Sequence, residues 1–295
     1  MSTYKLHPLE EYLKSTKIIT INDNFKIRMN ENQLNNYNNH LYDMRINAMK
    51  ERIDKIISLN IKYPYNAKPV FYLYVAPTEN FREIMDYPSY IKSEWGGKPV
   101  RSYDLDGFKT AYSQSDNILL WNHEISDAED ANSVHELAHL VHGMFYRNSS
   151  LLCEGFADAF TFYILNYENK VDGYKELLRS LKESDILTAN DLLIAEENGT
   201  FNSRPMIPNK TCSFSIYYIS SYLFVRGLIE TIEKNKNINK FEAMQEFLNI
   251  QYNNNFYKQF SIFKIADDLN LDKDSLLNKK DIQLSVLEKI KRTNE

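Results

Sequence analysis

His135-Glu136-Leu137-Ala138-His139 is the stretch that decides the interpretation of this chain, and Glu154-Gly155-Phe156-Ala157-Asp158 follows shortly after it. The first stretch has the pattern HExxH and the second has the pattern ExxxD. Two histidines four residues apart on a helix point to the same side, because one helical turn takes about 3.6 residues. The pair can hold one metal ion, and Glu154 is the candidate third ligand of a site that keeps a fourth position open for water.

Helix signals surround both motifs. Ser126-Asp127-Ala128-Glu129 has the form of a capping box, with Ser at the N-cap and Glu three residues later. Gly143 can end the helix that this box opens. The expected buried positions of this helix are Val134, Leu137, Ala138 and Val141. A second helix, predicted from about Leu151 to Leu165, places Glu154 and Asp158 one turn apart.

The residues beside the three candidate ligands indicate hydrolysis. Glu136 flanks the same helix face as His135 and can take a proton from a water at the metal. Asp158 is suited to accept the second ring N–H of a ligand histidine and so to orient it. A chance match is the alternative, since HExxH arises in about one in a hundred chains of this length. The two predicted helices favour a real motif over chance.

Taken together, His135, Glu136, His139, Glu154 and Asp158 resemble the gluzincin metallopeptidases, the thermolysin-like clan. The resemblance covers about residues 68–230 and is strong only at the metal motifs. It implies Zn²⁺ held by the two histidines and Glu154, with Glu136 as general base and Asp158 holding His135. It also implies that the strand before the metal helix forms the edge of a sheet along the substrate cleft. Residues 116–121 form that predicted strand, with Tyr112 and Trp121 either as pocket walls or as packing residues.

One segment resembles a particular branch of this family, the aminopeptidases. Leu152-Cys153-Glu154-Gly155-Phe156-Ala157 looks like the ligand helix of the aminopeptidase branch. However, the Gly-x-Met-Glu-Asn motif with which that branch grips a free N-terminus is absent upstream. Endopeptidase activity is therefore favoured over aminopeptidase activity.

His142 shares the helix face of the two ligand histidines. As a third ligand it is geometrically poor, because a position seven residues after His135 lies about 10 Å along the helix axis. Packing, or a hydrogen bond beneath the site, is the favoured interpretation.

No histidine follows His142, so a later histidine cannot stabilise the charge that develops on the carbonyl oxygen. Residues 217–226 look like the helix that supplies a tyrosine for this purpose in collagenase-like and aminopeptidase-like relatives. Tyr218 is the best match and Tyr217 is the second choice. The alternative is that both belong to an aromatic stripe in the core.

Bulk composition is that of an ordinary soluble globular protein, with 43% hydrophobic and 25% charged residues among 295. The net charge of −5 and the absence of a basic stripe argue against a nucleic-acid partner. No run of about 18 apolar residues occurs, so no membrane span is expected. The N-terminus has no secretory signal, which predicts a cytoplasmic protein, or a secreted one if a leader had been removed. The two cysteines, Cys153 and Cys212, are expected to be free thiols.

Three segments are predicted along the chain. Residues 1–60 are an N-terminal extension with a hairpin (Lys17 to Ile27) and one long helix (Glu31 to Leu59). Residues 61–150 form a sheet-bearing lobe that ends in the HExxH helix; its first strand spans Lys68 to Ala76, and Thr78 caps a helix to about Met85. Residues 151–295 form a helical lobe with the third zinc ligand and the candidate tyrosine. Its predicted helices span about 172–183, 188–196, 213–234 and 239–250, and a long loop with Arg204 covers Glu196 to Thr211.

The expected fold is therefore α+β: a thermolysin-like, two-lobed metallopeptidase with a small mixed sheet in the upper lobe and a mainly helical lower lobe. The expected function is that of a zinc-dependent endopeptidase acting on a peptide or protein substrate. If the protein is cytosolic, the substrate is expected to be one specific peptide or protein, because a broad endopeptidase would threaten its host. Two alternatives stay open: a catalytically weak metal-bearing binding or regulatory protein on the same scaffold, and hydrolysis of a non-peptide amide or an epoxide. The sequence does not indicate the oligomeric state.

Overall fold

The chain is described by a computed structural model that covers residues 16–41, 43–66, 69–76, 110–113, 118–122, 131–145, 149–167, 174–201, 206–208, 213–253 and 258–292. It divides into two compact units, Met1–Leu140 and Val141–Glu295. This division differs from the three predicted segments, because the first 60 residues belong to the same unit as the rest of the sheet. The division also falls inside helix α6 (Ala131–His142) rather than after it.

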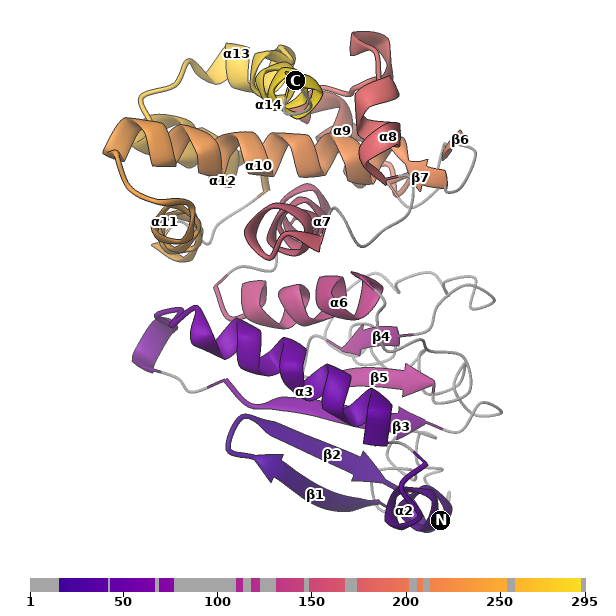
Figure 1. The fold of residues 1–295 in the computed structure, drawn as a ribbon. Helices are drawn as coiled ribbons and strands as arrows, with labels where there is room; N and C mark the ends of the chain where they lie inside the picture. Colours follow the sequence, from indigo (N-terminus) through magenta and orange to yellow (C-terminus); the bar gives the residue numbers. More distant parts are fainter. Residues whose placement is uncertain are drawn as a thin grey trace, which may run out of the picture. The chain divides into compact units, whose positions relative to one another are not determined.

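A five-stranded mixed sheet forms the framework of the first unit, in the order β1-β2-β3-β5-β4 (Figure 1). The strands are β1 (Lys17–Asn22), β2 (Phe25–Met29), β3 (Phe71–Ala76), β4 (Thr110–Ser113) and β5 (Ile118–Asn122). The pairs β2–β3 and β3–β5 are parallel, whereas β1–β2 and β4–β5 are antiparallel. The prediction of a small mixed sheet is thereby confirmed.

The predicted hairpin is β1 and β2, and it turns at Asp23-Asn24. The hairpin is not a separate extension, because Phe25 of β2 lies in register with Phe71 of β3. Alternate residues of β2 are fully buried, namely Phe25, Ile27 and Met29. Burial of every second side chain is what a strand with one face against the core requires. The apolar face of the hairpin therefore completes the core of the first unit.

The prediction of one long helix from Glu31 to Leu59 is wrong. The structure has two helices, α2 (Glu31–Asn38) and α3 (Asp43–Ser58). Between them His40 has a φ of 61°, a left-handed conformation that no α-helix continues through. The apolar spacing alone did not reveal this break. The buried side of α3 keeps the predicted spacing of three and four residues, with Ile46, Met49, Ile53 and Ile56 inside.

The strand before the metal helix is not at the edge of the sheet. β5 lies between β3 and β4, and among the described strands the edges are β1 and β4. The expected edge position of residues 116–121 is therefore wrong. β4, which the sequence pattern did not predict, covers the outer side of β5 by antiparallel pairing of Tyr112 with Leu119. The side chains of Tyr112 and Trp121 lie outside the described parts, as do Thr78 to Met85, Arg204 and Cys212.

The second unit is built mainly of helices (Figure 1). The predicted helices are present, and their bounds are α7 (Ser150–Asp158), α8 (Tyr174–Ser180), α9 (Ala189–Glu197), α10 (Ile216–Lys236) and α11 (Lys240–Asn253). Three further helices follow in the described part of the unit: α12 (Lys258–Asp268), α13 (Lys273–Asn278) and α14 (Asp281–Arg292). The predicted long loop from Glu196 to Thr211 contains a strand, β6 (Met206–Pro208), which pairs with β7 (Ser213–Ser215).

The helix that starts at Ser150 changes its geometry after Asp158. It continues as a π-helix over Ala159–Ile164, a wider turn that is common at functional sites. The chain as a whole is α+β, as predicted. Among the described residues, no helix combines the length and the apolar character needed to cross a membrane.

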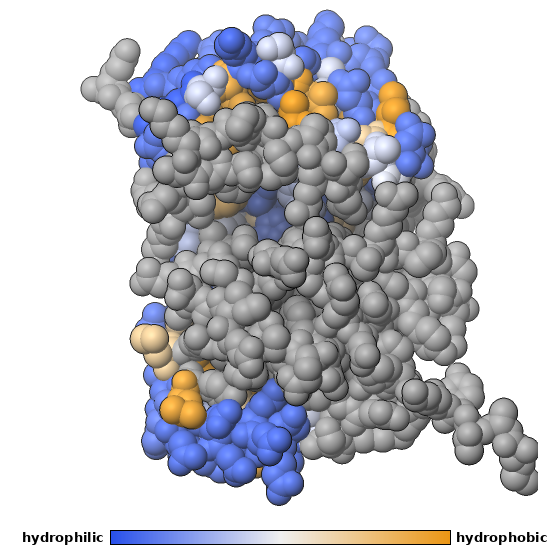
Figure 2. Space-filling view, turned by 90° about the vertical axis from the view of Figure 1, so that its right-hand side faces the viewer, coloured by the Kyte–Doolittle hydropathy of each residue, from blue (hydrophilic) through white to orange (hydrophobic). Residues whose placement is uncertain are grey.

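Exposed hydrophobic residues are few in the described parts. On the face drawn in Figure 2, hydrophilic residues cover most of the described surface, and hydrophobic residues appear among them in small groups. The exposed large ones are Ile18, Leu41, Met44, Ile194 and Phe241. Side chains of this kind that stand singly are normal on a protein surface.

Candidate metal centre

Helix α6 carries both histidines of the HExxH motif. Its four predicted core positions are all buried, with exposed fractions of 0–1%: Val134, Leu137, Ala138 and Val141. The helix ends at His142, immediately before Gly143, as predicted. The predicted capping box at residues 126–129 lies outside the described part. Near the start of α6, the buried Arg52 of α3 donates a hydrogen bond to the Ser133 hydroxyl, which holds this helix within the first unit.

The two motif histidines face one another. Their Nε2 atoms lie 3.0 Å apart, and their rings meet edge to face with centroids 4.7 Å apart and an interplanar angle of 86°. His139 is 7% exposed, whereas His135 is half-buried. The spacing suits a hydrogen bond, in which one imidazole donates its N–H to the other. It also suits two ligands of one ion, because two Zn–N bonds of 2.0 to 2.1 Å at a tetrahedral angle separate the nitrogens by about 3.3 Å.

Glu154 of α7 completes a group of three. One ligand atom each from His135, His139 and Glu154 lie within 4.8 Å of one another. Two imidazole nitrogens and a carboxylate oxygen form a donor set that zinc accepts in catalytic sites, where a fourth position stays open. The residues present therefore fit a zinc ion. The three predicted metal ligands are the three that the structure brings together.

The N-terminus of α7 is held by two side chains. Ser149 is the N-cap, and its hydroxyl accepts a hydrogen bond from the backbone N–H of Leu152. The carboxylate of Glu196, in α9, accepts hydrogen bonds from the Ser149 hydroxyl at 3.0 Å and from the Leu151 N–H at 3.4 Å. A carboxylate at this end of a helix is favourable, because the N-terminal amides carry a partial positive charge. Glu154 therefore lies on a helix whose first turn is held by the side chains of Ser149 and Glu196.

Gly155 allows α7 to lie unusually close to α10. A Cβ atom at this position would be 2.5 Å from the carbonyl oxygen of Ser221. No side chain fits there, so the backbones of the two helices meet directly beside Glu154. Cys153, which directly precedes Glu154 in the sequence, is half-buried.

Two further predicted site residues lie on the same helices as the ligands. Glu136 is half-buried on α6, next to His135. Asp158 is the last residue of α7 and is 8% exposed, one turn after Glu154. A carboxylate so deeply buried needs hydrogen-bonding partners to stay ionised, which is what an orienting role would give it.

The two candidate tyrosines occupy the first turn of α10. Both rings contact Phe201, with centroids 5.5 Å from Tyr217 and 5.9 Å from Tyr218. Phe201 is buried, whereas both tyrosines are half-buried. The aromatic packing that formed the alternative interpretation is therefore present.

Arg226, later on α10, has a structural role. Its side chain donates to Glu230 at 2.8 Å and to the Tyr222 hydroxyl at 2.7 Å, and it lies over the Tyr163 ring at 4.4 Å. The Tyr163 hydroxyl donates in turn to Glu233 at 3.0 Å. Burial raises the pKa of Tyr163 above its usual range, and the nearby carboxylates raise this pKa further. Tyr163 therefore stays a neutral donor that ties the π-helical turn to α10.

His142 is buried and makes a contact that the sequence did not identify. Its Nε2–H donates to the side-chain oxygen of Gln251 at 2.8 Å, across 109 residues of sequence. His142 is not among the three grouped ligands. The predicted hydrogen bond beneath the site is confirmed. Its partner, Gln251, was missed, because a single glutamine in an amphipathic helix carries no distinguishing signal.

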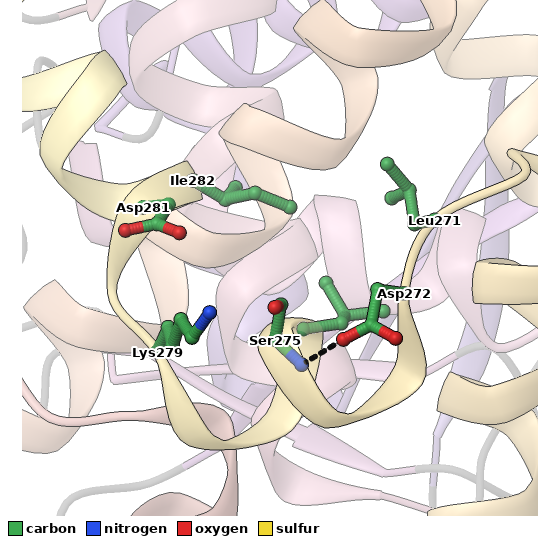
Figure 3. Close-up of a pocket in the computed structure, with 7 residues that line it drawn as sticks. Leu271, Asp272, Ser275, Lys279, Asp281 and Ile282 are labelled. Atoms are coloured by element: carbon green, nitrogen blue, oxygen red, sulfur yellow. Dashed lines mark hydrogen bonds between the residues drawn. The ribbon is translucent and has the colours of Figure 1, made fainter.

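A small pocket at α13 and α14 has a different character (Figure 3). Three aliphatic side chains line it, Leu271, Leu276 and Ile282, together with the charged Asp272, Lys279 and Asp281. Asp272 is occupied as the N-cap of α13, where it accepts from the Ser275 N–H at 2.7 Å, and this bond lowers the pKa of Asp272. None of the predicted site residues lines this pocket.

Comparisons with family models, with curated proteins and with solved structures found no match for this chain. Conclusions about function therefore rest on the residues themselves, and first on the group formed by His135, His139 and Glu154.

Proposed function

We propose that this protein is a zinc-dependent metallopeptidase of the gluzincin type, with a thermolysin-like arrangement around the metal, that cleaves internal bonds of a peptide or protein. One observation carries the proposal: ligand atoms of His135, His139 and Glu154 lie within 4.8 Å of one another. Glu136 stands between the two histidines on the same helix, which is the spacing that metal-assisted hydrolysis requires.

His135, His139 and Glu154 would hold the zinc ion. When bound, the ion would polarise the scissile carbonyl and lower the pKa of a water molecule. Glu136 removes a proton from that water and delivers it to the leaving amine. Asp158 accepts the second N–H of His135 and keeps its ring oriented toward the site. Tyr218, or else Tyr217, donates its hydroxyl hydrogen to the oxygen on which negative charge develops.

We infer a specific peptide or protein as the substrate. The absence of the motif that grips a free N-terminus supports internal cleavage rather than aminopeptidase action.

A second function has one observation in its favour. Both candidate tyrosines pack on Phe201, and no histidine follows His142 to replace them as a donor. A site without such a donor would hold zinc and turn over slowly, as in a metal-bearing binding or regulatory protein. The intact Glu136 supports the peptidase instead, since a binding protein has no use for a general base.

The test compares the wild type with Glu136→Gln on a diverse peptide library, with zinc content assayed in both. The matched control is Glu176→Gln, which makes the same change at an exposed position of α8. We expect full zinc in all three proteins and cleavage by the wild type and the control. Loss of the general base is expected to slow cleavage by about 10²- to 10⁴-fold. Zinc without cleavage in every protein would favour the binding function, and absence of zinc from the wild type would refute the metal centre.

A further inference from the structure

His142, the last residue of α6, and Gln251 of α11 form a buried polar pair. Each side chain is 1% exposed, and the His142 Nε2–H donates to the Gln251 oxygen at 2.8 Å. A polar ring at such a position costs free energy unless it is hydrogen-bonded, and an aliphatic residue would fill the space without that cost. A directional bond, unlike an aliphatic contact, specifies one orientation of the two helices that it joins.

The same imidazole is part of a stack of rings. It lies against the Phe156 ring at 4.5 Å between centroids and 18° between planes. Phe156 lies in turn against Phe247 of α11, with centroids 6.3 Å apart and planes 5° apart. Phe247 and Gln251 are four residues apart on α11, so they belong to one face of that helix. This face of α11 therefore holds His142 of α6 by a hydrogen bond and Phe156 of α7 by stacking.

The two residues that α11 contacts, His142 and Phe156, are close in sequence to the candidate ligands. His142 follows His139 by three residues, and Phe156 follows Glu154 by two. A helix rises 1.5 Å per residue, so these offsets amount to about 4.5 Å and 3 Å along the respective axes. A rotation or shift of the last turn of α6 would therefore displace His139 by almost the same distance as His142. Catalytic metal sites tolerate errors of only a few tenths of an ångström in ligand position.

We propose that His142 and Gln251 are positioning residues of the metal centre. Their hydrogen bond, with the stack on Phe156, holds the last turn of α6 in one rotational setting against α7 and so sets the ligand geometry at His139 and Glu154. This inference rests on the proposed metal site, and neither residue touches the metal or the substrate.

The test measures Co²⁺ binding to the full-length protein, because the visible absorption of Co²⁺ reports ligand geometry independently of activity. Gln251→Met removes the acceptor and keeps the side-chain length. The matched control is Gln283→Met, which removes another fully buried glutamine with one hydrogen bond, from its Nε2 to the Leu187 carbonyl at 3.2 Å. We expect Gln251→Met to bind Co²⁺ at least about 10-fold more weakly with a shifted spectrum. The control is expected to keep the wild-type affinity and spectrum, although both variants lose stability.

Two further variants separate positioning from general packing. His142→Phe keeps a ring on Phe156 and loses the hydrogen bond, so it is expected to shift the spectrum as Gln251→Met does. Gln251→Glu keeps an acceptor and is expected to retain the wild-type spectrum. A wild type that binds no Co²⁺ or Zn²⁺ would refute the proposed metal centre. A wild type that binds metal, with Gln251→Met or His142→Phe behaving like the control, would overturn only the positioning role.

Discussion

A Cβ atom on Gly155 would lie 2.5 Å from the backbone carbonyl oxygen of Ser221. Real Cβ atoms do not approach a carbonyl so closely, so α7 and α10 can keep their present contact only if this position carries no side chain. The contact matters for the site because Gly155 directly follows the candidate ligand Glu154. Since the obstacle is backbone, it cannot rotate away.

The first prediction concerns this contact. Gly155→Ala is expected to lower the free energy of unfolding by about 1–3 kcal/mol, the usual cost of overpacking, despite the better helix propensity of Ala. It is also expected to weaken zinc binding, because α7 has to move away from α10. Urea unfolding and a zinc competition assay measure the two effects.

Gly227→Ala is the control, since its nearest obstacle is a methyl group of Ile282 at 2.2 Å. It is expected to destabilise the fold without changing zinc affinity; equal zinc affinity in both variants would contradict this account.

A second prediction concerns the cap of the ligand helix. Glu196→Gln removes the negative charge that accepts from the Ser149 hydroxyl and the Leu151 N–H. We expect a loss of about 0.3–1 kcal/mol in the free energy of unfolding, and a smaller loss at high salt, because the interaction with the helix N-terminus is screened. Glu197→Gln, at the exposed neighbouring position, should change stability much less. If the two variants unfold alike at low salt, Glu196 does not stabilise α7.

The third prediction decides between the two tyrosines. Tyr218→Phe is expected to lower kcat by about 10²-fold or more, with KM and zinc content little changed, because it removes a donor to the transition state. Tyr217→Phe keeps the ring that stacks on Phe201 and should leave kcat near the wild-type value. Steady-state kinetics on a cleaved library peptide measure both. The reverse order would assign the role to Tyr217, and normal kcat in both would mean that the tyrosines only pack.

The fourth prediction concerns metal removal and pH. Zinc competes with protons for the two imidazoles, so its affinity should fall as the pH drops. Folding and binding are linked: zinc at 100 times its Kd should add about 2.7 kcal/mol of stability at neutral pH and little below pH 5. Thermal unfolding with zinc and with a chelator measures this difference. In His139→Ala the difference should disappear at every pH, and its survival there would place the metal elsewhere.

The local pattern was sufficient to predict several elements. The hairpin of β1 and β2, the strands β3 and β5, and the helices α6 and α7 all appear where the periodicity indicated. The end of α6 before Gly143 also follows from local chemistry. Such features depend on residues a few positions apart, so the order of side chains is enough to specify them. The break between α2 and α3 is an exception, because the apolar spacing continues on α3 and conceals the turn at His40.

Other features depended on partners that lie far away in the sequence. The position of β5 inside the sheet follows from its pairing with β3, much earlier in the chain, on one side and with β4 on the other, and a short apolar run does not say how many neighbours a strand has. Likewise, nothing near His142 indicated which side chain would be the partner of its hydrogen bond. Its partner, Gln251, comes from a helix 109 residues later.

The sequence by itself determined which residues are able to form a metal centre. The HExxH spacing turns two imidazoles to one helix face, and ExxxD places two carboxylates one turn apart. Only the tertiary structure decided that Glu154 lies within 4.8 Å of both histidines, and that α7 meets α10 at Gly155. The physical reason is that helix geometry is set by hydrogen bonds between near neighbours. The mutual position of two helices is set by the packing of side chains that the chain brings together from a distance.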